Sequence, residues 1–198
     1  MTHRWCPTVE AGGVVWGYLG PPEGRPPPPP MAWANVPEGQ RGASKVRINC
    51  NYLQCLEGGL DSSHAGVLHA SSLSKDLFPT HPRSKTNMVE LLLADRAPEI
   101  EVELTDTGLR YAAIRQVGDD QAYARITTWI APWFCSVPEH QGVPRIINGF
   151  TPIDDTSTWA WFIWYHPTDK IDHEVLTEIS GLHHLQAGYR SPANRDNF

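Results

Sequence analysis

Residues 51–69 constrain this chain more than any other segment, because titratable residues recur there within an apolar repeat. The apolar positions stand three, four and seven residues apart, and they are Leu53, Leu56, Leu60 and Val67. This spacing predicts one amphipathic helix whose apolar stripe faces the core. At about 100° per residue, His64 lies inside the stripe, and Asp61 and Glu57 lie on its flank. Because an unpartnered buried polar group costs about 1–3 kcal/mol, these side chains need partners.

The spacing of the two histidines is unusual for an ordinary helix. His69 follows His64 by five residues, so on an ideal α-helix the two rings point about 140° apart. A five-residue repeat suits a π turn, and Gly66 gives the backbone room to distort. Two converging imidazoles and one carboxylate would form the facial triad of non-haem Fe(II) oxygenases. The spacing alone slightly favours the alternative, in which one histidine is a hydrogen-bonded core residue and the other stands at a frayed helix end.

The order of residues in this segment carries a specific resemblance. Residues 51–64, NYLQCLEGGLDSSH, followed by Leu68 and His69, closely resemble the active-site segment of Rieske-type aromatic ring-hydroxylating oxygenase alpha subunits, in the phthalate dioxygenase-like branch. Weaker resemblance to the same family runs through residues 7–22, 109–115 and 151–156. The resemblance therefore extends over nearly the whole chain.

The resemblance implies a mononuclear iron site. In that family the residues at His64 and His69 ligate Fe(II), and the residue at Asp61 carries electrons from a Rieske [2Fe–2S] cluster on the neighbouring subunit. The third ligand, an aspartate, comes from a helix beyond residues 194–196, whereas this sequence stops at Phe198. The implied reaction is O₂-dependent hydroxylation of an aromatic substrate, or oxidative removal of an O-alkyl group. The implied partners are a reductase or Rieske electron donor and two further subunits in a ring-shaped homotrimer.

The cysteine pattern gives no sign of a cluster or a disulfide framework. Cys6, Cys50, Cys55 and Cys135 are few and scattered. No C-x-H pair is followed by C-x-x-H, the pattern that binds a Rieske cluster. We therefore expect no Rieske domain in this chain and no [2Fe–2S] cluster encoded by it. With no signal peptide visible, we expect a reducing, cytoplasmic location.

The rest of the chain reads as strands with few helices. Alternating or apolar runs predict strands at residues 12–19, 99–104, 109–117, 124–137, 145–153 and 159–165. Residues 169–182 show helical spacing, and residues 71–87 read as a loop. The predicted class is α+β, an antiparallel sheet of five or six strands wrapped around helices, in agreement with the helix-grip fold that the resemblance implies. We expect residues 1–45 to be an N-terminal strand and proline-rich linker, and residues 46–198 to be a partial mononuclear-iron catalytic domain.

Composition narrows the remaining function classes. A net charge of −6 disfavours nucleic acid as a partner, and no apolar run approaches the ~20 residues that span a bilayer. Asp154 and Asp155 are expected to form a turn, not a metal site. Three alternatives stay open: a non-enzymatic small-molecule-binding helix-grip domain, an interaction module for a full-length alpha subunit, and, with less support, a zinc hydrolase.

Overall fold

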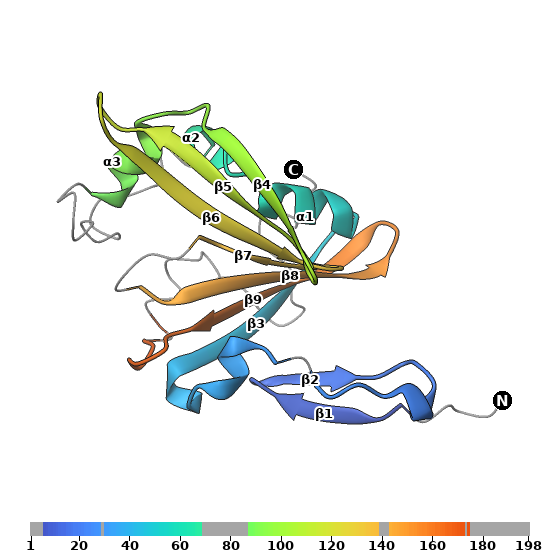
Figure 1. Ribbon diagram of the computed structural model, residues 1–198. Coiled ribbons are helices and arrows are strands. Elements are labelled where there is room, and N and C mark those ends of the chain that lie inside the picture. The colour runs from blue at the N-terminus through green and yellow to red at the C-terminus, as the bar shows by residue number, and fades with distance from the viewer. Residues whose placement is uncertain (1–5, 29, 69–86, 139–142, 173, 175–198) are drawn as a thin grey trace.

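One antiparallel sheet of seven strands dominates the computed structural model, which describes residues 6–28, 30–68, 87–138, 143–172 and 174. The strand order is β3-β9-β8-β7-β6-β5-β4, and a separate hairpin pairs β1 with β2 (Figure 1). The strands are β1 (Thr8–Ala11), β2 (Val14–Gly17), β3 (Arg41–Ile48), β4 (Glu99–Thr105), β5 (Gly108–Gln116), β6 (Ala122–Ile130), β7 (Phe134–Ser136), β8 (Arg145–Asp154) and β9 (Ser157–Tyr165).

Helices are short and few in the described part of the chain. They are α1 (Tyr52–Leu60), α2 (His64–Val67) and α3 (Met88–Leu93), with three 3₁₀ turns η1 (Pro22–Gly24), η2 (Ala32–Asn35) and η3 (Glu38–Gln40). An antiparallel sheet with a few helices confirms the predicted α+β class. The helix expected over residues 169–182 and the loop expected over residues 71–87 lie almost entirely outside the described residues.

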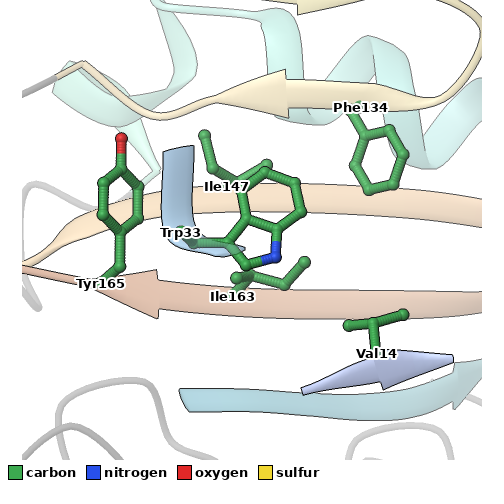
Figure 2. Packing of buried hydrophobic residues seen from close by; sticks show 6 residues of the cluster. All are labelled: Val14, Trp33, Phe134, Ile147, Ile163 and Tyr165. Carbon is green, nitrogen blue, oxygen red and sulfur yellow. The ribbon is translucent and has the colours of Figure 1, made fainter. Parts of the chain in front are cut away.

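The two faces of the sheet carry separate apolar clusters. On one face, which we call the outer face, Trp33 of η2 and Val14 of β2 pack over the side chains of four strand residues, Phe134, Ile147, Ile163 and Tyr165 (Figure 2). On the opposite, inner face, Leu56 of α1 packs over Val46, Cys135, Phe150 and Ala160. Both faces at the β3, β9 and β8 end of the sheet are therefore covered.

Helix α1 lies unusually close to the inner face at one glycine. A Cβ atom on Gly59 would stand 2.9 Å from Phe150 Cε2 and 3.0 Å from Cys135 Sγ, so only glycine fits there. The other end of α1 is fixed by Asn51, whose Oδ1 accepts the Leu53 N–H at 2.9 Å and whose Nδ2 donates to the Asp155 carbonyl at 2.9 Å. The helix is thus held at both ends.

The predicted single helix through Val67 is wrong, because the chain breaks at Asp61. Asp61 has an extended backbone (φ −68°, ψ 113°), and its carboxylate accepts the Ser63 and His64 N–H groups at 2.8 and 3.1 Å. A short acidic side chain that bonds nearby backbone amides competes with helix continuation. After the break Val67 is exposed. The Leu68 N–H bonds the His64 carbonyl at 2.7 Å, which is α-type spacing, so the expected π turn is absent as far as Leu68.

Other boundaries differ from the predictions in smaller ways. The strand predicted at residues 12–19 is found as β2 and is shorter, because Gly12 and Gly13, with positive φ values of 68° and 75°, form the turn that joins it to β1. Strand β3 begins at Arg41, where a loop was expected up to Lys45, and α3 was not predicted. Strand β4 is solvent-exposed along nearly its whole length, although its alternation predicts a half-buried strand.

Truncation of Ile163 should destabilise the protein strongly. Ile163 is 1% exposed within the outer cluster, and Ile-to-Ala changes in packed cores cost roughly 2–5 kcal/mol. Leu104, which is 82% exposed, provides the matched control. Urea unfolding should show a large loss in the free energy of unfolding for Ile163→Ala. For Leu104→Ala the free energy of unfolding should change by no more than about 0.5 kcal/mol. Equal losses would contradict the described packing.

Candidate metal site

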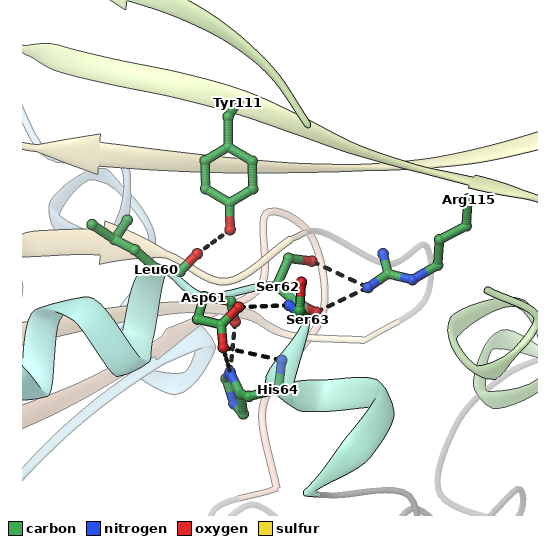
Figure 3. A network of polar contacts seen from close by, with 7 residues as sticks. All are labelled: Leu60, Asp61, Ser62, Ser63, His64, Tyr111 and Arg115. Atoms are coloured by element: carbon green, nitrogen blue, oxygen red, sulfur yellow. Dashed lines mark hydrogen bonds and ion pairs between the residues drawn. The ribbon is translucent and has the colours of Figure 1, made fainter. Parts of the chain in front are cut away.

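Asp61 and His64 form the centre of the candidate site, in the turn between α1 and α2 (Figure 3). The Asp61 backbone carbonyl lies 2.6 Å from His64 Nδ1, and the Asp61 carboxylate lies 3.7 Å from the same nitrogen. The side chains of His64 and Asp61 are 28% and 48% exposed. His64 is therefore partnered by the adjacent turn, as the sequence required.

This contact suits a metal ligand. A neutral imidazole that donates its Nδ1 proton to a carbonyl carries its lone pair on Nε2. Metal-binding histidines regularly use a backbone carbonyl or carboxylate in this way to fix the ring. The donor chemistry of His64 therefore fits iron ligation through Nε2.

The structure describes only part of the predicted ligand set. His69 lies outside the described residues, and the third ligand is expected from a helix beyond Phe198, the last residue of this sequence. Within the described ranges, no three His, Cys, Asp or Glu side chains gather closely enough to bind a metal ion. The convergence of His64 and His69 therefore stays a prediction.

Two residues of β5 bind the same turn from the sheet side. The Tyr111 hydroxyl donates to the Leu60 carbonyl, and Arg115 Nη2 donates to the Ser62 carbonyl at 2.9 Å (Figure 3). Arg115 Nε also donates to the Asp95 carbonyl, at 3.1 Å. The backbone is thus held on both sides of Asp61.

A second arginine lies close to Arg115 on the inner face. Cross-strand pairing sets Arg115 opposite Tyr123 and Arg125 opposite Ala113, so the two arginines are diagonal neighbours on β5 and β6. Burial lowers the pKa of both guanidinium groups, and the positive charge of Arg115 lowers the pKa of Arg125 further. Arginine nevertheless stays protonated in proteins.

Each of these arginines has an unsatisfied donor. Arg115 Nη1 and Arg125 Nε are buried without a hydrogen-bond partner among the described residues. Two neighbouring guanidinium cations with unused N–H groups carry the charge and the donors that a carboxylate would need. Sequence reasoning missed this feature, although alternation along residues 109–117 places Arg115 on the same face as Tyr111.

The remaining titratable candidates have structural roles. Burial raises the pKa of the Cys55 and Cys135 thiols to about 12, with Cys50 adding to the rise at Cys55, so neither thiol ionises near neutral pH. All four cysteines are free. Asp154 accepts hydrogen bonds from Thr156 and Ser157, which confirms the expected turn. His166 Nδ1 accepts the Asp169 N–H at 2.9 Å.

In the described ranges, no helix is both long and apolar enough to cross a membrane.

Comparison with known proteins gives a consistent family. Residues 17–197 match the family described as LigXa C-terminal domain like. The oxygenase subunit of phthalate 4,5-dioxygenase from Pseudomonas putida is 33% identical over 204 residues, covering 100% of this chain and 46% of that protein. The oxygenase subunit of 3-chlorobenzoate-3,4-dioxygenase from Comamonas testosteroni is 32% identical, covering 79% of this chain and 35% of that protein. This chain thus spans about half or less of the length of these two relatives.

A solved structure supports the fold independently. Dicamba monooxygenase bound to dicamba superimposes with a TM-score of 0.60 at 16% identity, covering 94% of this chain and 56% of the other. At this identity the likeness establishes the fold only. The chain belongs to the LigXa C-terminal domain-like family and has the fold of Rieske oxygenase catalytic domains.

Proposed function

We propose that this chain is the catalytic-domain portion of a Rieske non-haem iron oxygenase that uses O₂ to hydroxylate or O-dealkylate an aromatic substrate. One observation carries the proposal: His64 Nδ1 lies 2.6 Å from the Asp61 carbonyl, which holds Nε2 in its ligand form. The similarity to oxygenase subunits of a phthalate and a chlorobenzoate dioxygenase supports the same reaction class.

In this proposal His64 and His69 bind Fe(II), and the aspartate that the family resemblance places beyond Phe198 completes the set. The iron supplies the O₂ binding and activation that no amino-acid side chain provides. The chain's own part is geometric. The Asp61 carbonyl holds the His64 ring and its tautomer, and α1 and the sheet hold the turn that carries both residues.

Asp61 is proposed to face an electron donor. Its side chain is 48% exposed while its carboxylate stays within 3.7 Å of His64 Nδ1, so it can contact both the site and a neighbouring protein. We propose that the [2Fe–2S] cluster lies on a neighbouring subunit or separate donor, that residues 1–45 link to the preceding part of the protein, and that the assembly is a homotrimer. The family resemblance supports these proposals.

The substrate is proposed to be an aromatic carboxylate. Arg115 Nη1 and Arg125 Nε are buried donors without a partner among the described residues, and Arg115 also binds the Asp61 turn through the Ser62 carbonyl. The two relatives are described as acting on phthalate and 3-chlorobenzoate, both of which carry carboxylates. A carboxylate bound there satisfies the donors and relieves the repulsion between the guanidinium groups.

The same face supports a second candidate, a non-enzymatic domain that binds aromatic acids without metal. The observation that supports this candidate is the arginine pair with its unsatisfied donors, because carboxylate binding by two arginines does not require iron. Phthalate binding that is indifferent to chelators, together with no metal binding, would favour this candidate over the oxygenase.

Replacement of His64 should abolish metal binding and leave the fold intact. Anaerobic Fe(II) titration of the chain should show saturable binding that is lost in both His64→Ala and His69→Ala, because each removes a proposed ligand. His166→Ala is the matched control, since that imidazole accepts the Asp169 N–H in a distant turn. Undiminished iron stoichiometry in His64→Ala, with unchanged circular dichroism, would exclude the proposed site.

Replacement of Arg125 should weaken phthalate binding selectively. A hydrogen bond to a charged group contributes roughly 1.5–3 kcal/mol, so Arg125→Met should raise the phthalate Kd by about ten- to a hundred-fold in calorimetry. Arg110→Met is the control, because Arg110 is exposed and pairs with Glu103 at 2.6 Å. Benzamide, which lacks the charge, should bind both variants alike. An equal loss for phthalate and benzamide would contradict carboxylate recognition.

A further inference from the structure

We propose that Tyr111 and Arg115 are positioning residues that fix the backbone around Asp61 and thereby set the tautomer and orientation of the His64 ring. The part about the ring stands on the described contacts alone. The consequence for metal affinity rests on the proposed iron site.

The two residues bind the carbonyl groups immediately before and after Asp61. Tyr111 donates to the Leu60 carbonyl, and Arg115 Nη2 donates to the Ser62 carbonyl at 2.9 Å (Figure 3). They stand four residues apart on β5, so strand alternation puts both side chains on the inner face. A single strand therefore holds both flanks of the turn.

The supporting strand is itself well anchored. Strand β5 pairs along its length with β4 and β6. Arg115 also donates to the Asp95 carbonyl at 3.1 Å, which ties the segment after α3 to the same side chain. The position of the turn is thus fixed by the sheet as well as by the two short helices beside it.

These contacts control where the Asp61 carbonyl points. A carbonyl direction changes when the adjacent peptide planes rotate, and the planes on either side are held through the Leu60 and Ser62 oxygens. The Asp61 carbonyl is the group 2.6 Å from His64 Nδ1. Release of either flank lets this carbonyl turn away, and the imidazole then loses the acceptor that selects its Nδ1–H form.

Burial makes the contacts hard to replace with water. Tyr111 is 8% exposed and Arg115 is 0% exposed. Burial raises the pKa of the Tyr111 phenol, so it stays protonated and remains a donor at neutral pH, although the hydrogen bond with Thr127 opposes part of the rise. Removal of the hydroxyl therefore leaves the Leu60 carbonyl without its sheet-side donor.

The test reads the His64 ring directly in metal-free protein. Long-range ¹H–¹⁵N spectra of the histidine rings, recorded well above the ordinary histidine pKa of about 6.5, separate the two tautomers. The wild-type chain should show His64 as the Nδ1–H form, and Tyr111→Phe should show a mixture of tautomers. Tyr165→Phe, which removes the same hydroxyl in the outer cluster, should leave the His64 signals unchanged.

A second variant keeps the test decisive if Tyr111→Phe does not fold. Thr127→Val preserves side-chain shape and removes the hydroxyl that bonds the Tyr111 oxygen, so it should shift the His64 tautomers in the same direction. A His64 ring that stays fully Nδ1–H in whichever variant folds, or that is Nε2–H in the wild type, would overturn the proposal.

Metal affinity provides a readout that separates this proposal from the proposed function. Loss of a group that orients a metal-binding histidine typically weakens affinity 10- to 100-fold, so the Co(II) Kd should rise at least about tenfold in folded Tyr111→Phe protein. A tautomer shift in a chain that binds no Co(II) would uphold the positioning role and refute the iron site. An unaltered Co(II) affinity in a variant with shifted tautomers would refute the metal consequence.

Discussion

The close approach of Gly59 to the sheet is the constraint on which the site geometry depends. A Cβ at this position would stand 2.9 Å from Phe150 and 3.0 Å from Cys135, so any larger residue would lift the C-terminal end of α1 from the inner face. Because α1 lies this close to the sheet, the carbonyl of the next residue, Leu60, can accept a hydrogen bond from Tyr111. The turn at Asp61 follows at once. Packing of one helix end therefore decides whether the polar contacts of the site can form.

The electrostatic arrangement of the site differs from that of the apolar clusters. Arg115 and Arg125 are positively charged and desolvated, and this lowers the pKa of both. Arg115 has three backbone or side-chain acceptors around it, yet one nitrogen of each arginine lacks a partner among the described residues. Such unsatisfied donors oppose folding. A bound anion that accepts hydrogen bonds from these donors would remove this cost, in agreement with the proposed carboxylate substrate.

Sequence patterns predicted the elements whose signals are local. Alternation predicted the strands at residues 99–104 and 109–117, which pair as β4 and β5, and the acidic residues at the β8–β9 turn were recognised as structural. The end of α1 was missed because the apolar repeat continues from Leu60 to Val67 across the break. Helix α3 was missed because six residues are too few to display a period. The exposure of β4 could not be foreseen, since alternation records one apolar face but not whether anything covers it.

The candidate site was predicted only in part, because sequence patterns report local signals and not contacts between distant segments. The segment order identified Asp61, His64 and His69, whereas the roles of Tyr111 and Arg115 depend on contacts with residues 51 and 53 positions away in the chain. No spacing rule along one strand reports such contacts. The diagonal placement of Arg115 and Arg125 likewise depends on the register between β5 and β6, which side-chain alternation leaves open.

The closest contacts from β5 to the turn end on backbone oxygens. Tyr111 and the closest bond of Arg115 reach the carbonyl groups of Leu60 and Ser62, a group that every amino acid carries. A substitution at position 60 or 62 therefore leaves these two carbonyl acceptors in place. Position 60 is limited to apolar residues by its packing against the inner cluster, whereas position 62 is set mainly by its backbone carbonyl.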